Sequence, residues 1–206
     1  MAKIDVQKLN EVLRRMREED PDFKVFGSEV HKYRLGPPLS EEELLAFEQK
    51  YQIRLPTEYR FFLKEAGDGG ANRPVPKTRS RSNAGAGPDY GLLPLDEALN
   101  ECDPSMPFPF SQPSDGQSAQ GDEKWGEEIP YPGLLGISHR GCTYMWYLVV
   151  NGPAYGTVWS TDWDDNLFDP TGLSFAAWYQ ESGVDIWFGD RGIKQGKPYS
   201  ILSPEE

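Results

Sequence analysis

The chain has 206 residues and a formal net charge of −12, from 33 acidic and 21 basic side chains. A surface with this excess of carboxylates repels nucleic-acid phosphates and anionic lipid headgroups, so we expect no nucleic acid and no membrane among its partners. Hydrophobic residues make up 37% of the chain and aromatic residues 13%, enough for a packed core, whereas 21 glycines and 18 prolines predict many turns and loops.

The N-terminus and the two cysteines bear on the cellular location. Residues 1–6 lack the apolar core of a signal peptide. The longest apolar run, residues 144–150, is far shorter than the ~18 residues that a membrane span needs. Cys102 and Cys142 fit no paired spacing, which favours free thiols in a reducing compartment. We therefore expect a cytoplasmic protein, and a monomer, although the sequence does not determine the oligomeric state.

The chain starts with a predicted amphipathic helix that ends before Pro21. Its apolar side chains recur at helical spacing, at Val6, Leu9, Leu13 and Met16. Residues 23–26 and 30–35 are then predicted to be short strands, and the Gly-Pro-Pro sequence at 36–38 breaks the chain.

The sequence that starts at Ser40 indicates a second helix. The Ser40 side chain can accept a hydrogen bond from the backbone of Glu43, and Glu43 can reach back, which together form a capping box. Three consecutive glutamates in the first turn favour the positive end of the helix dipole. The buried face of this helix is predicted to carry Leu44, Phe47 and Tyr51.

A third helix is predicted to start after Leu55, because Pro56 needs no hydrogen-bond partner at a helix start. Its apolar stripe follows the i, i+3, i+4, i+7 pattern, at Tyr59, Phe62, Leu63 and Ala66. Glycines are the usual residues at helix ends, and here they stand at Gly67, Gly69 and Gly70.

The rest of the chain alternates predicted loops and strands. Two stretches rich in glycine, proline and polar residues, 72–89 and 103–130, are predicted to be loops, the first of them mobile. The segments between and after them are predicted to be a strand at 91–95, a short helix at 95–102, and strands at 134–138, 142–150 and 157–160. A C-terminal helix, interrupted at Gly183, is traced by Phe175, Trp178, Tyr179, Ser182 and Ile186. This order of helices, antiparallel strands and a final helix predicts an α+β fold.

Residues 39–180 contain a capped helix ending in a Phe-Glu pair, an L-P-x-x-Y-R-x-F-L motif and a glycine-rich stop, in that order. This order and spacing resemble the SUKH superfamily of immunity proteins. The residues that carry this resemblance are Ser40, Glu43, Phe47, Glu48, Leu55, Pro56, Tyr59, Phe62, Leu63, Gly67, Gly69 and Gly70. On this basis we expect residues 1–206 to form a single domain, with a helical N-terminal extension at 1–36 and loop insertions at 72–89 and 103–130.

The resemblance implies N-terminal helices packed on a curved, mainly antiparallel sheet with a C-terminal helix. It implies immunity against a bacterial toxin, often a nuclease or deaminase, by binding a cognate toxin that we expect to be basic. It also allows an alternative function, that of a non-enzymatic scaffold or regulatory module that binds a cellular partner, as in a minority of relatives. The motif is structural, so it implies no catalytic residue and no cofactor.

The sequence offers little support for an enzyme or a metal site. His139 and Cys142 are close in the chain, but no nucleophile signature surrounds them, and we expect Cys142 to be core packing in an apolar strand. Asp162, Asp164 and Asn166 have the initial spacing of a calcium loop, but that loop's later glycine and glutamate are replaced by leucines, so we expect no metal.

The candidate binding site is a short loop after the last predicted strand. It mixes aromatic and carboxylate side chains, at Trp159, Asp162, Trp163, Asp164 and Asp165. Aromatic anchors ringed by charge are typical of interface hot spots. We predict toxin binding at Asp162, Trp163, Asp164 and Asp165. The alternative is that both tryptophans belong to the core and the aspartates are only solvated.

Overall fold

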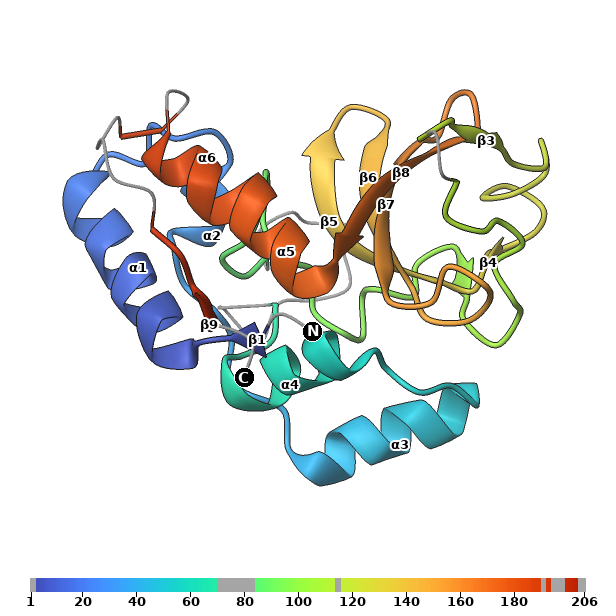
Figure 1. Cartoon of the computed structure of the whole chain (residues 1–206), viewed down its shortest axis with the longest axis horizontal. Coiled ribbons are helices and arrows are strands. Elements are labelled where there is room, and N and C mark those ends of the chain that lie inside the picture. The colour runs from blue at the N-terminus through green and yellow to red at the C-terminus, as the bar shows by residue number, and fades with distance from the viewer. Residues whose placement is uncertain (1–2, 70–83, 114–115, 190–191, 194–198, 204–206) are drawn as a thin grey trace.

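The computed structural model describes residues 3–69, 84–113, 116–189, 192–193 and 199–203 (Figure 1). Gly70 and most of the first predicted loop lie outside these residues. The fold is α+β, as predicted: helices cover one face of an open, five-stranded antiparallel sheet, and a long loop covers the other (Figure 1). Two small pairs complete the strands: β1 (Lys3–Ile4) with β9 (Leu202–Ser203), and β2 (Cys102–Asp103) with β4 (Tyr131–Pro132).

The central sheet has the order β3-β8-β7-β6-β5. Its strands are β3 (Ala119–Gln120), β5 (Leu134–Gly141), β6 (Tyr144–Val149), β7 (Thr157–Asp162) and β8 (Leu167–Ser174). The three predicted strands are confirmed, with β5 and β7 longer than predicted. The sequence did not predict β8, because it contains Asp169, Pro170 and Gly172, residue types that are depleted in strands. Proline is tolerated there because β8 lies beside the short edge strand β3.

Side chains alternate between the two faces of the sheet, as the period of two in a strand requires. The helix-covered face receives Leu135, Ile137, Trp146, Leu148 and Val158. The loop-covered face receives Leu134, Met145, Tyr147, Val149, Trp159 and Phe168. The molecule therefore has two cores that share one sheet.

The three helices predicted in the N-terminal part of the chain are present, with the bounds α1 (Val6–Glu19), α3 (Glu41–Tyr51) and α4 (Thr57–Glu65). The C-terminal helix is continuous but contains a π-helical turn, so that α5 (Phe175–Tyr179) passes through Gln180–Val184 into α6 (Asp185–Phe188). That turn includes Gly183, where the sequence predicts an interruption. Ser182 and Ile186 are only half-buried, because the π-helical turn shifts the buried stripe to Val184 and Trp187.

The strands predicted at 23–26 and 30–35 are wrong. The segment forms turns and a one-turn helix, α2 (Ser28–His31). The reason is the buried carboxylate of Asp20, which accepts hydrogen bonds from the amides of Lys24 (2.7 Å) and Val25 (3.2 Å) and from the Tyr33 hydroxyl (2.6 Å). A side-chain acceptor of this kind satisfies the backbone locally and competes with a strand ladder.

The SUKH-like motif is held together by polar contacts between α3 and α4. The capping box is present: the Ser40 amide donates to the Glu43 carboxylate (2.8 Å), and the Glu43 amide donates to the Ser40 hydroxyl (3.2 Å). Glu48 accepts from the Leu55 amide (2.9 Å) and the Arg60 guanidinium (3.3 Å). The motif residues therefore fix the path between two helices.

The apolar motif residues pack as predicted. Tyr59, Phe62 and Leu63 are buried in the same core as Leu44, and Phe47 is half-buried against it. The ring of Phe62 meets those of Phe175 and Tyr179 at centroid distances of 5.2 and 5.3 Å. This helix stripe thus joins the N-terminal half of the motif to the C-terminal helix.

The glycine-rich stop brings the chain against residues 93–95. Gly67 has φ +147°, and a Cβ there would lie 2.4 Å from the Gly36 carbonyl oxygen. A Cβ at Gly69 would lie 2.3 Å from the carbonyl carbon of Leu93. Between them, the buried Asp68 carboxylate accepts a hydrogen bond from the Leu95 amide (3.0 Å). The motif thereby positions the segment that follows Leu93.

Residues 91–102 do not form the strand and helix that the sequence predicts. Residues 91–95 make only isolated bridges, at Leu92. Residues 95–101 form turns instead of a helix, and Cys102 begins β2. The backbone of this segment forms hydrogen bonds with the edge of β5. The Leu93 amide donates to the Ile137 carbonyl (2.9 Å), and the Gly136 amide donates to the Ala98 carbonyl (2.8 Å). These edge contacts replace the internal hydrogen bonds that a helix would make.

Both predicted loops are packed where the structure describes them. Residues 84–88 are buried, and the Tyr179 hydroxyl donates to the Ala86 carbonyl (2.7 Å), so this part of the first loop is not mobile as predicted. In the second loop, Phe108 is fully buried against Trp159 and Phe168. Apolar residues spaced among prolines and glycines give no periodic signal, yet they cover the second core.

Candidate functional site

A pocket of about 230 Å³ opens on the loop-covered face of the sheet, and we call it the acidic pocket. It is lined by Leu93, Glu97, Ala98, Asn100, Glu101, Gly136, His139, Met145, Tyr147 and Trp163. The residues come from three places: the segment along the edge of β5, the strands β5 and β6, and the hairpin between β7 and β8. Among the residues that the structure describes, no lysine or arginine lines it.

Trp163 forms one wall of the acidic pocket and is held by both its backbone and its side chain. Its amide donates to the Thr143 carbonyl (3.0 Å), which ties the β7–β8 hairpin to the β5–β6 turn. Its indole N–H donates to the Tyr147 hydroxyl (2.9 Å), and its ring meets His139 edge-on at 5.8 Å. Trp163 is therefore half-buried.

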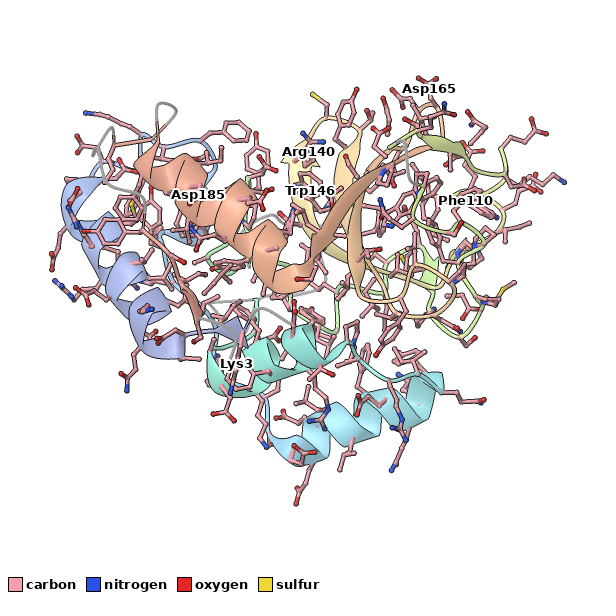
Figure 2. All side chains as sticks on the ribbon, viewed as in Figure 1. Lys3, Phe110, Arg140, Trp146, Asp165 and Asp185 are labelled. Atoms are coloured by element: carbon pink, nitrogen blue, oxygen red, sulfur yellow. The ribbon has the colours of Figure 1, made fainter. Side chains whose placement is uncertain are left out.

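The predicted aspartates occupy the β7–β8 hairpin next to this wall. Asp162 accepts a hydrogen bond from the Thr143 hydroxyl (2.8 Å), which lowers the pKa of its carboxyl, and the Asp164 amide adds a further bond (3.2 Å). Asp162 is therefore charged at neutral pH. Asp164 and Asp165 are exposed, and Figure 2 shows Asp165 at the hairpin tip, apart from Arg140 and Trp146.

The opposite rim carries two glutamates, Glu97 and Glu101. The Glu97 carboxylate makes no hydrogen bond or ion pair within the described part of the chain. The backbone at Glu101 is fixed, because its carbonyl accepts from the Tyr131 amide (2.7 Å). The pocket thus has aromatic walls and a rim of two glutamates, and the hairpin aspartates are close in sequence to its Trp163 wall, which is an arrangement suited to a cationic ligand.

The structure brings together only part of the predicted cluster. Asp162, Trp163, Asp164 and Asp165 share the hairpin, whereas Trp159 is fully buried in the second core. Sequence reasoning missed Glu97, Glu101 and Tyr147. The acidic character of residues 96–103 is visible in the sequence, but nothing there places it beside a hairpin more than 60 residues away.

The residues considered above for catalysis or metal binding lie outside the acidic pocket, except His139. Cys142 is exposed in the β5–β6 turn at φ +48°, so its predicted role in the core is wrong: the apolar pattern of β6 starts only at Met145. The Asn166 side chain forms hydrogen bonds within the protein: it accepts one from the Tyr131 hydroxyl (2.9 Å) and donates one to the Asp122 carbonyl (3.2 Å). Within the described ranges, no cluster of three or more His, Cys, Asp or Glu residues could hold a metal ion.

These features define an α+β protein whose shared motif builds a scaffold and whose acidic pocket lies on the opposite side of the sheet. Residues 38–181 match the SMI1 / KNR4 family (SUKH-1). The match covers well over half of the chain, so the chain belongs to this family, which includes immunity proteins and SMI1/KNR4 relatives. Comparisons with curated proteins and with solved structures give no match. Across the described residues, no helix has the length and hydropathy to cross a membrane.

Proposed function

We propose that the chain is a non-enzymatic immunity protein that binds and neutralises a basic cognate toxin through the acidic pocket and the β7–β8 hairpin. One observation carries the proposal most strongly: Glu97 and Glu101 line the pocket, and no described lysine or arginine does. Asp162, Asp164 and Asp165 lie on the hairpin whose Trp163 forms one wall of this pocket.

Charge favours this class of partner. A toxin that acts on nucleic acid needs a basic surface, and a partner of net charge −12 can cover that surface by electrostatic complementarity. Nuclease–immunity pairs are among the tightest protein complexes known. Two free cysteines support action in the cytoplasm, where thiols stay reduced.

The test starts with affinity capture, using the full chain as bait in the cells that encode it. The captured protein is then produced in a bacterial host alone and together with this chain. We expect growth arrest in the first case and restored growth in the second. Co-production with a Glu97→Lys, Asp164→Lys, Asp165→Lys variant should restore growth poorly. A captured partner that does no harm to the host would contradict the immunity role and favour a scaffold that binds a cellular protein.

A further inference from the structure

The helix-covered face shows how this protein accommodates a guanidinium group. There, the Arg140 guanidinium carbon lies 4.3 Å from the centre of the Trp146 ring. The Trp146 indole N–H donates to the Asp89 carboxylate (2.7 Å), and the same carboxylate oxygen lies 3.8 Å from the Arg140 Nε. Figure 2 shows Arg140 and Trp146 side by side near α5. A tryptophan face and a carboxylate thus hold an arginine from the chain itself.

The acidic pocket offers the same kinds of groups on the other face. His139 and Arg140 are neighbours at the irregular end of β5, and they serve different faces: His139 lines the acidic pocket, whereas Arg140 lies over Trp146. On the pocket side, Trp163 provides the aromatic wall, and its indole N–H is satisfied by Tyr147. Glu97 provides a carboxylate without a partner among the described residues. The difference is that no described arginine or lysine lines this pocket.

The size of the pocket limits the ligand. Its volume of about 230 Å³ is below the roughly 300–1,000 Å³ of sites for drug-sized ligands and cofactors. It is far larger than the roughly 30 Å³ that one water molecule occupies in the liquid. A single side chain is a ligand of intermediate size, with its charged end at the carboxylate rim and its aliphatic part against Leu93 and Met145.

We propose that the acidic pocket binds one arginine side chain of the protein partner, an inference that rests on the proposed function and names the group recognised. Arginine suits the pocket better than lysine, because its planar guanidinium stacks on aromatic faces and forms paired hydrogen bonds with carboxylates. Its weaker hydration also lowers the cost of entering a partly enclosed site. The partner's arginine takes the place beside Trp163 that Arg140 takes beside Trp146.

The test uses a blocked amino acid and does not need the toxin. N-acetyl-arginine methylamide is titrated into the full chain labelled with ¹⁵N at its tryptophans, and the indole N–H signals are followed by NMR. The Trp163 signal is assigned by its loss in a Trp163→Phe variant. We expect a saturable shift of this signal with half-saturation in the millimolar range. The citrulline analogue, which is neutral and nearly the same shape, should give no saturable shift.

Two glutamine variants provide the matched comparison. Glu97→Gln should weaken arginine binding by about tenfold or more, because a charge-assisted hydrogen bond is lost. Glu42→Gln, at an exposed position on α3, removes the same charge and should leave binding unchanged. The dispersion of the remaining tryptophan signals reports whether each variant is folded.

The outcomes separate this inference from the proposed function. Equal shifts with arginine and citrulline, or no shift of Trp163 at all, would overturn the arginine pocket, and an equal or stronger shift with the lysine analogue would overturn the choice of arginine. Neither result bears on whether a captured toxin is neutralised. Conversely, specific arginine binding to a chain whose captured partner is harmless would retain the pocket and reject immunity.

Discussion

The two faces of the sheet use similar residues in opposite ways. On the helix-covered face, Trp146 stacks on Arg140 and donates to Asp89, so the aromatic–carboxylate corner is filled from within the chain. On the loop-covered face, Trp163 and Glu97 border a pocket that no described lysine or arginine lines. One face has therefore completed its aromatic–carboxylate interactions with an arginine of the chain, whereas the other has no described lysine or arginine in its pocket, where we propose that a partner's cation binds.

The family motif belongs to the completed face. Glu48 holds the link between α3 and α4, and Phe62 packs on the C-terminal helix. The motif also contacts the segment that carries Glu97, because Asp68 accepts a hydrogen bond from Leu95 and Gly69 packs against Leu93. The shared sequence therefore specifies the scaffold, and we propose that residues outside it select the partner.

The largest effect should come from the core of the helix-covered face. Phe62 is fully buried, so Phe62→Ala should lower the free energy of unfolding by about 3–5 kcal/mol. Urea unfolding followed by fluorescence measures this change. Phe26→Ala is the control, because the Phe26 side chain is 56% exposed, and it should cost less than about 1 kcal/mol. A loss below about 0.5 kcal/mol for Phe62→Ala would contradict the packing described.

The second effect is a pH dependence from His31, which is buried on the same face. Burial lowers the pKa of His31 to about 3, so the folded state keeps it neutral while the unfolded state binds a proton below pH 6.5. Its contribution is complete above pH 6.5 and decreases as the pH falls towards 3. At pH 5 the loss should be about 2 kcal/mol relative to pH 8.

The His31→Asn variant isolates this contribution. Asparagine can accept the hydrogen bond that the Tyr33 amide donates to His31 Nδ1 (3.0 Å), but it does not titrate. The difference in unfolding free energy between the native chain and the variant should therefore change between pH 8 and pH 5. A difference that is the same at both pH values would mean that folding does not lower the pKa of His31.

The third prediction compares the stability effects of the Arg140 site on the helix-covered face and of the acidic pocket on the loop-covered face. Arg140→Ala should cost about 1 kcal/mol, because it removes a cation–π contact and the packing of the aliphatic stem. Glu97→Gln should change stability by less than about 0.5 kcal/mol, since its carboxylate has no partner among the described residues. Thermal unfolding of both variants gives the comparison. A large loss for Glu97→Gln would show that the pocket is completed from within after all.

The sequence predicts the scaffold better than the site, for physical reasons. Capping at Ser40 and the apolar stripe of α4 are local patterns with a fixed period, and both are confirmed. The Asp20 network and the path of residues 91–102 depend on long-range hydrogen bonds, which no periodicity reveals. The acidic hairpin was identified from composition, but the pocket needs Glu97 and Tyr147, which only the edge of β5 brings near Trp163.

The central claim is that the acidic side of the molecule, and not its motif-bearing helices, meets a basic toxin. Its most direct test is the association rate with the captured toxin, measured at low and high salt. Asp164→Lys with Asp165→Lys should slow association by about tenfold or more at low salt, with less effect at high salt and nearly unchanged thermal stability. Glu42→Lys with Glu65→Lys changes the net charge equally, on α3 and α4, and should slow association much less. Equal rates for the two variants, or a slower rate for the helix variant, would contradict the account.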